Sequence, residues 1–101
     1  MLARFDWDPD KASSNYRKHG VDFETARLVF ADQHALTIFD RFIGAEQRWH
    51  TLGMVEGSLL LLVVHTIYDM NEGGLFGEII RIISARPATR KERWRYEQEV
   101  R

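Results

Sequence analysis

The 101-residue sequence contains no cysteine and only two prolines. The absence of cysteine excludes a disulfide framework and any cysteine-ligated metal site. The longest apolar run, residues 59–64, has six residues, far short of the roughly 20 that a membrane-spanning helix needs. No signal peptide is recognisable either. We therefore expect a single cytoplasmic domain over residues 1–101.

The chain also lacks a strong net charge, which is −1. That balance argues against a protein that coats nucleic acid without specificity. The charges are unevenly distributed, however. Residues 1–80 contain seven Lys or Arg and twelve Asp or Glu, giving −5, whereas residues 81–101 contain seven and three, giving +4. This asymmetry predicts either a local anionic partner or a basic helix that is merely solvated.

Two helices are predicted near the N-terminus. The first covers residues 8–20, because Asp8 is a good N-cap, Pro9 suits the first helical position and Gly20 is a good stop. The second covers residues 21–32. Asp22 caps it, and its apolar residues recur at helical spacing.

The middle of the chain predicts a four-stranded sheet. Short connections favour an antiparallel meander. The third strand is continuously apolar and is expected at the sheet centre, covered on both faces. The glycine-rich connection "DMNEGGLFGE" is expected to be long and mobile. The predicted strands are residues 35–40, 46–55, 58–68 and 76–86. With a C-terminal helix added, the fold class is α+β.

That last helix is predicted to begin after Thr89, because "TRKE" fits a capping box between Thr89 and Glu92. Its first turn carries Arg90, Lys91 and Arg93, and the helix dipole disfavours each exposed charge there by about 0.3–1 kcal/mol. The same turn suits an anion, because free backbone N–H groups and cations point the same way.

Three bulky residues of this helix have expected positions. Trp94 and Val100 are predicted to anchor it on the sheet. Tyr96 either packs at the edge of the core or takes part in chemistry on the same face as Arg93, which lies three residues away.

The fourth strand has arginine in an apolar pattern. Strict alternation places Arg81 and Arg86 on opposite faces. A charge within a sheet needs a partner, so Arg81 predicts either a structural ion pair, with Glu46 or Glu78, or a site for an external anion. Arg86 ends the strand, which favours a functional role.

A histidine and further cations could converge with these arginines. Arg48 and His50 share one face of the second strand. His65, near the end of the third strand, either joins them or is a core histidine. Together they resemble what cleavage of RNA requires: a base for the 2′-hydroxyl, cations for the transition state and a proton donor for the leaving oxygen. The sequence shows no metal-ligand spacing, phosphate loop or serine triad.

Three stretches together resemble the BrnT toxins, which belong to the RelE/ParE-like group of type II toxin–antitoxin systems: "FDWDPDKASSNYRKHGVDFETARLVF", "EQRWHTLG" and "IRIISARPATRKERWRYE". The resemblance implies a RelE-like fold and a metal-independent ribonuclease, without cofactor, that inhibits translation. It also implies a BrnA-like antitoxin that neutralises the toxin and has a ribbon-helix-helix DNA-binding domain. The toxin would then contact operator DNA only through this antitoxin.

The polar motif positions of the family fall on Lys18, His19, Arg48, Arg81, Arg86, Arg93 and Tyr96, and the positions of His65, Arg90 and Lys91 add these three to the expected site. Arg81 and Arg86 would hold the scissile phosphate, while Arg48 and Arg93 would stabilise developing charge. A proton would move through His65 or Tyr96. The expected catalytic set is Arg48, His65, Arg81, Arg86, Arg93 and Tyr96, and the expected RNA contacts are Lys18, His19, Arg90 and Lys91.

The sequence departs from the family pattern at two places. Gln47 separates Glu46 from Arg48, so that either residue is displaced, and the "DMNEGGLFGE" connection is long. Two alternatives use the same basic face. One is a non-catalytic protein-binding module, and the other is a ParE-like toxin that targets gyrase.

Overall fold

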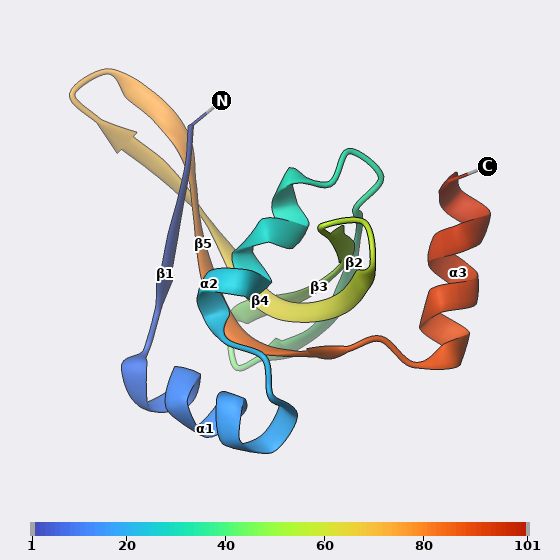
Figure 1. Ribbon diagram of the computed structural model, residues 1–101. Coiled ribbons are helices and arrows are strands. Elements are labelled where there is room, and N and C mark those ends of the chain that lie inside the picture. Colours follow the sequence, from blue (N-terminus) through green and yellow to red (C-terminus); the bar gives the residue numbers. More distant parts are fainter. Residues whose placement is uncertain (1, 101) are drawn as a thin grey trace.

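The computed structural model describes residues 2–100, with side chains for residues 3–99. The sheet has the strand order β1-β5-β4-β3-β2 (Figure 1). No helix within the described residues is long and apolar enough to cross a membrane. The elements are β1 (Leu2–Trp7), α1 (Pro9–His19), α2 (Phe23–Ala26), the 3₁₀ helix η1 (Arg27–Ala31), β2 (Leu36–Ile43), β3 (Glu46–Val55), β4 (Leu59–Glu72), β5 (Leu75–Pro87) and α3 (Arg90–Val100).

The sheet has five strands and is mixed, so the prediction of a four-stranded antiparallel sheet is wrong. Strands β2 to β5 do form an antiparallel meander. The missed strand is β1, which pairs in parallel with β5. It is an edge strand in which exposed Arg4 and Asp6 alternate with half-buried Phe5 and Trp7. This alternation shows that only one of its faces packs against the core.

The first helix is confirmed, and the second differs from the prediction. The Asp8 carboxylate accepts the Asp10 N–H at 2.9 Å, and Gly20 ends α1 at φ +71°. The second helix has only four α-helical residues and continues as η1. η1 packs so closely on β3 that a Cβ atom added to Gly53 would lie 2.7 Å from the Val29 Cβ.

The connection between β4 and β5 is a two-residue turn, so the prediction of a long loop is wrong. The strands continue to Glu72 and Leu75, and Gly73 and Gly74 join them at φ +57° and +83°. Positive φ at both positions is what a tight hairpin turn requires. The hairpin projects beyond the rest of the sheet at the upper left of Figure 1.

The two faces of the sheet are covered differently. On the helical face, residues of α2 and η1 pack on Leu61, Val63, Ile82 and Ala85 to form the main core. The opposite face, which carries Leu52, Leu62, Val64, Thr66 and the residues in register with them, is called the open face. Only the end of the sheet near α3 is covered there, where Tyr96 packs on Leu52, Leu60 and Leu62.

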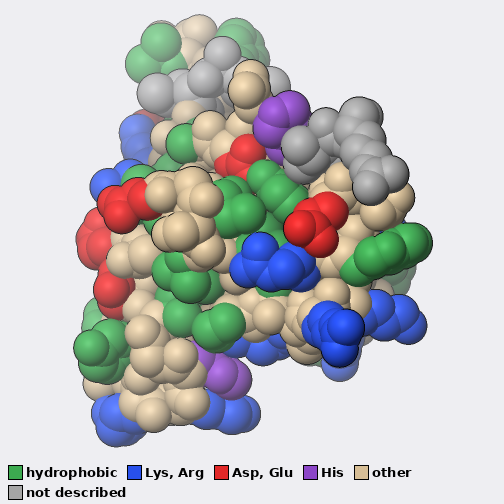
Figure 2. All heavy atoms as spheres, turned by 45° about the vertical axis from the view of Figure 1, so that its right-hand side comes forward, with side chains coloured by type: hydrophobic (Ala, Val, Ile, Leu, Met, Phe, Trp, Pro, Cys, Tyr) green, Lys and Arg blue, Asp and Glu red, His purple; other side chains and the backbone are tan. Residues whose placement is uncertain are grey.

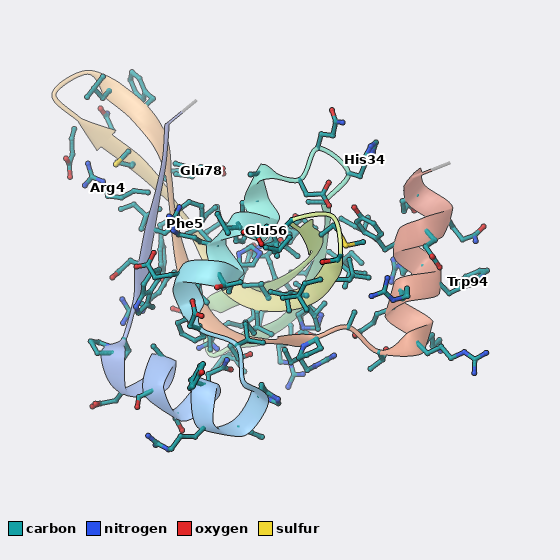
Figure 3. The ribbon with its side chains drawn as sticks, in the orientation of Figure 1. Arg4, Phe5, His34, Glu56, Glu78 and Trp94 are labelled. Carbon is teal, nitrogen blue, oxygen red and sulfur yellow. The ribbon has the colours of Figure 1, made fainter. Side chains whose placement is uncertain are left out.

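Helix α3 is attached by a different residue from those predicted. Trp94 is 62% exposed and points away from the sheet (Figure 3), so its prediction as an anchor is wrong. The anchor is Tyr96, which is 5% exposed and donates its hydroxyl hydrogen to Asp32. Val100 lies outside the residues with described side chains. The capping box is confirmed, because Thr89 and Glu92 exchange hydrogen bonds of 2.9 and 3.2 Å.

Candidate functional site: the open face of the sheet

A β-bulge in β5 determines which side chains reach the open face. Along β4, Val64 pairs with Ser84, but the next residue, His65, pairs with Ile82. Ile83 is therefore an extra residue in β5. Such an insertion breaks the alternation of side chains between the faces.

The bulge places Arg81 and Arg86 on the same face. Arg81 lies opposite Thr66, and Arg86 lies opposite Leu62. Thr66 and Leu62 share the open face because they are four residues apart on β4. The prediction from strict alternation, which put the two arginines on opposite faces, is therefore wrong.

A buried asparagine holds the bulged strand in place. Asn15 of α1 is 7% exposed, and its side-chain amide donates to Ala85 O at 2.8 Å and to Val21 O at 3.1 Å. The Ala85 N–H donates to Asn15 Oδ1 at 3.0 Å. β1 ends at Trp7, so it no longer forms hydrogen bonds with β5 beyond Ile82. The side chain of Asn15 forms hydrogen bonds with the β5 backbone there instead. This role could not be predicted from the sequence, because nothing local marks a helical asparagine for it.

Each of the three predicted catalytic arginines on the open face has a carboxylate partner within the chain. A guanidinium has five N–H donors, so one carboxylate does not saturate it. The Nε of Arg48 and one terminal nitrogen of Arg81 are engaged, which leaves other N–H groups for an anion, whereas Arg86 uses both terminal nitrogens. The pairs are Arg48–Glu46 at 2.8 Å, Arg81–Asp6 at 2.6 Å, and Arg86–Glu92 at 2.8 and 2.9 Å.

Two of these pairs differ from, or add to, what was predicted from the sequence. The partner of Arg81 is Asp6 of β1, and not Glu46 or Glu78. Glu92 serves two purposes, because it caps α3 and also binds Arg86. The hydrogen bonds from Arg86 lower the pKa of Glu92 to about 2. Glu92 is therefore ionised at neutral pH.

The pocket where β3 approaches β4 adds a tyrosine to the open face. Tyr68 donates to Glu46 Oε2 at 2.5 Å, next to the Arg48–Glu46 pair. The pKa of Glu46 lies below its usual value because of the hydrogen bond from Tyr68 and then that from Arg48. Thr66 also lines this pocket, and its hydroxyl is buried without a partner among the described residues.

His50 is the histidine that lies with these arginines. Its Nε2 is 3.0 Å from Asp40 Oδ2, and its side chain is 29% exposed. His50 pairs with Val64, which pairs with Ser84, so this row of the open face ends between Arg81 and Arg86 on β5. A carboxylate beside an imidazole fixes the orientation of the ring.

His65 is not brought to the open face. It lies on the helical face with 0% exposure, and its Nε2 is 2.7 Å from Thr51 Oγ1. The ring of Phe30 stands edge-on at 4.9 Å between centroids. Burial lowers the pKa of His65 to about 4. The imidazole is therefore neutral at physiological pH.

Tyr96 is buried at the covered end of the open face, and its hydroxyl is bound to Asp32. Burial, followed by the hydrogen bond to Asp32, raises the pKa of Tyr96 to about 12. Asp32 also accepts the Met54 N–H at 2.8 Å and the His34 N–H at 2.9 Å. Tyr96 thus connects α3 to the segment after η1.

The remaining predicted residues are cations on the two terminal helices. Arg90, Lys91 and Arg93 are exposed in the first turn of α3, and Lys18 and His19 lie at the end of α1. In Figure 2, Lys and Arg side chains gather along the lower part of the molecule, at the height of α1 and the start of α3. Among the described residues, no group of three His, Asp or Glu side chains is arranged to hold a metal ion.

The fold and the site together define a small α+β protein with an arginine-rich sheet face. A family model described as "Ribonuclease toxin, BrnT, of type II toxin-antitoxin system" matches residues 7–92. The chain therefore belongs to the BrnT family of ribonuclease toxins, which confirms the resemblance found in the sequence. Membership in a type II system implies an antitoxin partner.

A solved structure supports the fold. The chain is similar to the Brucella abortus ribonuclease toxin BrnT, known from a 1.1 Å crystal structure, with a TM-score of 0.58 and 23% sequence identity. The alignment covers 89% of this chain and 100% of the Brucella chain. At that identity the likeness concerns the fold alone. No curated protein matched the sequence.

Proposed function

We propose that this chain is an endoribonuclease whose active site is the open face of the sheet. The carrying observation is that Arg48, His50, Arg81 and Arg86 share this face, because the bulge at Ile83 turns Arg86 toward the other three. Cations around an imidazole suit cleavage of a phosphodiester, in which negative charge develops on the phosphate oxygens.

Arg81 and Arg48 have the clearest roles. Arg81 holds the scissile phosphate with the N–H groups that Asp6 leaves free. Arg48, fixed by Glu46, stabilises the charge of the pentavalent transition state. Arg86 contributes positive charge from the end of β5 while it remains bound to Glu92.

Protons are transferred by His50 in this proposal. The 2′-oxygen attacks phosphorus and loses its proton, while the 5′-oxygen leaves and gains one. The products are a 2′,3′-cyclic phosphate and a 5′-hydroxyl. His50, oriented by Asp40, is within the open face and accessible. His65 and Tyr96 are buried, so we assign them to the core.

Two further features are proposed for the system. Arginines supply the positive charge, so that cleavage proceeds without a metal ion. The antitoxin is a BrnA-like ribbon-helix-helix protein that neutralises the toxin by covering the open face. Both are supported by membership in the family and by the arginine-rich face.

The test is RNA cleavage by purified protein in EDTA, with the product ends mapped. We expect 2′,3′-cyclic phosphate ends. Arg81→Ala should lower kcat about 10²–10³-fold, as loss of one transition-state donor does. Arg27→Ala is the matched control, because it also breaks an exposed ion pair, with Glu24 at 3.0 Å. Equal activity of the two variants would refute the assignment of Arg81.

The alternatives are separated by the same preparation. A wild-type protein that leaves RNA intact in EDTA but cleaves it with added Mg²⁺ would refute metal independence. A wild-type protein that leaves RNA intact both in EDTA and with Mg²⁺, but changes the supercoiling of DNA by gyrase, would refute the ribonuclease proposal.

A further inference from the structure

A pocket of about 270 Å³ lies between α1 and the bulged part of β5. Its helical side presents two lysines, one histidine and one serine, and its strand side presents the bulge. The side chains that matter for binding are Lys11, Ser14, Lys18, His19 and Ser84. It is separate from the pocket between β3 and β4 described above.

The pocket follows from the spacing of polar residues along α1. Lys11, Ser14 and Lys18 are separated by three and four residues, so they form one stripe along the helix. Asn15 belongs to the same stripe and bonds to the backbone of Ala85, so this polar stripe is the one that faces β5. Within this stripe only Asn15 is buried, so Lys11, Ser14 and Lys18 stay exposed around the hydrogen bonds that it makes to β5.

The charges of the pocket differ from those of the open face. Each of the three predicted catalytic arginines on the open face is bound to a carboxylate. Lys11 and Lys18 are exposed, and within residues 2–100 neither forms an ion pair. Their positive charge is therefore available to an external anion.

The pocket is also continuous with the open face. Ser84 lies on that face in the row of His50, between Arg81 and Arg86 along β5. Lys11 is near enough to the open face that its charge contributes, after Tyr68 and Arg48, to the lowered pKa of Glu46. An anion in the pocket would thus lie beside the site proposed for cleavage.

We propose that the α1–β5 pocket binds a phosphate of the RNA strand next to the scissile one, an inference that rests on the proposed ribonuclease function. The pocket offers lysine as a point charge and serine hydroxyls from both the helix and the strand. Such converging donors suit a tetrahedral phosphate, which lysine binds as a point charge while hydroxyl groups donate hydrogen bonds to the phosphate oxygens. The residues lining the pocket include no arginine.

The experiment measures binding of a single-stranded 2′-O-methyl RNA, which cannot be cleaved because it has no free 2′-hydroxyl. The test variant is Lys11→Gln combined with Lys18→Gln. Arg17→Gln is the control, because Arg17 is an exposed cation of the same helix that lies outside the pocket and bonds to Ser13. Affinity is measured at several salt concentrations.

The test variant should bind severalfold more weakly than wild type. Its slope of log affinity against log salt should be smaller by about 0.7, the value for one single-strand phosphate contact. Arg17→Gln should leave both quantities near wild type. Ser84→Ala should weaken binding less, without changing the slope, because it removes a donor but no charge.

Two results would overturn the inference. One is a salt slope of the Lys11/Lys18 variant equal to that of Arg17→Gln. The other is unchanged oligonucleotide binding together with lost binding of a poly-glutamate peptide, which would assign the pocket to an acidic protein partner. Cleavage of ordinary RNA by wild type is assayed separately. If the wild-type protein cleaves RNA but the Lys11/Lys18 variant binds the oligonucleotide as wild type does, only the pocket proposal is refuted. If the wild-type protein never cleaves RNA, the proposed ribonuclease function is refuted.

Discussion

The two faces of the sheet each carry one histidine, in opposite surroundings. On the helical face, His65 is enclosed by Phe30 and Thr51 with no exposed surface. On the open face, His50 is partly exposed and lies 3.0 Å from the carboxylate of Asp40. The first environment disfavours the charged imidazole, whereas the second places the ring beside a carboxylate. The covering of each face, rather than the residue type, therefore separates a core histidine from a candidate for proton transfer.

The largest expected effect comes from exchanging the two histidines for glutamine. His50→Gln should lower RNA cleavage about 10²–10⁴-fold, the range for loss of a general acid or base, while the free energy of unfolding stays within about 0.5 kcal/mol of wild type. His65→Gln should instead lower the stability and leave the rate of the remaining folded protein near wild type. Cleavage rates and urea denaturation of both variants provide the measurement. The reverse pattern would contradict the assignment.

The next effect is the pH dependence of stability. The pKa of His65 is lowered from 6.5 to about 4 by burial. Between these values the unfolded chain binds a proton that the folded protein does not, so the free energy of unfolding should fall as pH falls from 6.5 to 4. The full loss over the interval from 6.5 to about 4 is about 3 kcal/mol, at roughly 1.4 kcal/mol per pKa unit. Urea denaturation at pH 7.5 and 4.5 measures it.

His65→Gln is the control for that prediction, because glutamine keeps a polar side chain but does not titrate. This variant should lose much less stability over the same interval. The Arg86–Glu92 pair does not interfere, since the pKa of Glu92 is about 2 and its contribution is lost mainly below pH 4.5. An equal acid sensitivity of wild type and His65→Gln would show that another group is responsible.

The smallest effects concern the attachment of α3 at the covered end of the open face. Tyr96→Phe removes the hydrogen bond to Asp32 and should cost about 1.5–3 kcal/mol, as for a bond to a charged group. Trp94→Ala changes a larger side chain that is 62% exposed and should change stability by less than about 0.5 kcal/mol. Thermal denaturation compares them. A greater loss from Trp94→Ala would mean that α3 packs through its other side.

Local chemistry was sufficient to predict helix ends. The caps at Asp8, Asp22 and Thr89 all form the expected hydrogen bonds, because a cap depends on residues within a few positions of one another. The turn at Gly73–Gly74 was equally local, and a two-glycine hairpin between alternating segments could have been recognised. The alternation around Arg4 and Asp6 was also a legible signal for β1.

The arrangement of the site depended on contacts between distant segments. The bulge at Ile83 has no signature of its own, and it is held by Asn15, which lies 70 positions from Ala85. The partner of Arg81 comes from β1, 75 positions away. The residue types of the candidate site and the shared face of Arg48 and His50 could therefore be predicted from the sequence, but the face on which Arg86 lies could not.

The bulge at Ile83 also affects how relatives of this chain should be compared. Arg81 and Arg86 are an odd number of residues apart, yet they share a face because one residue between them is extra. A relative without the bulge would need an even separation to present the same pair. Deletion of Ile83 would remove the bulge and leave the two arginines four residues apart, so they would still share a face in a regular strand. An alignment with a one-residue gap at this point therefore preserves the spatial frame of the site, whereas an ungapped relative without the bulge presents its second arginine on the opposite face, even where every arginine is retained.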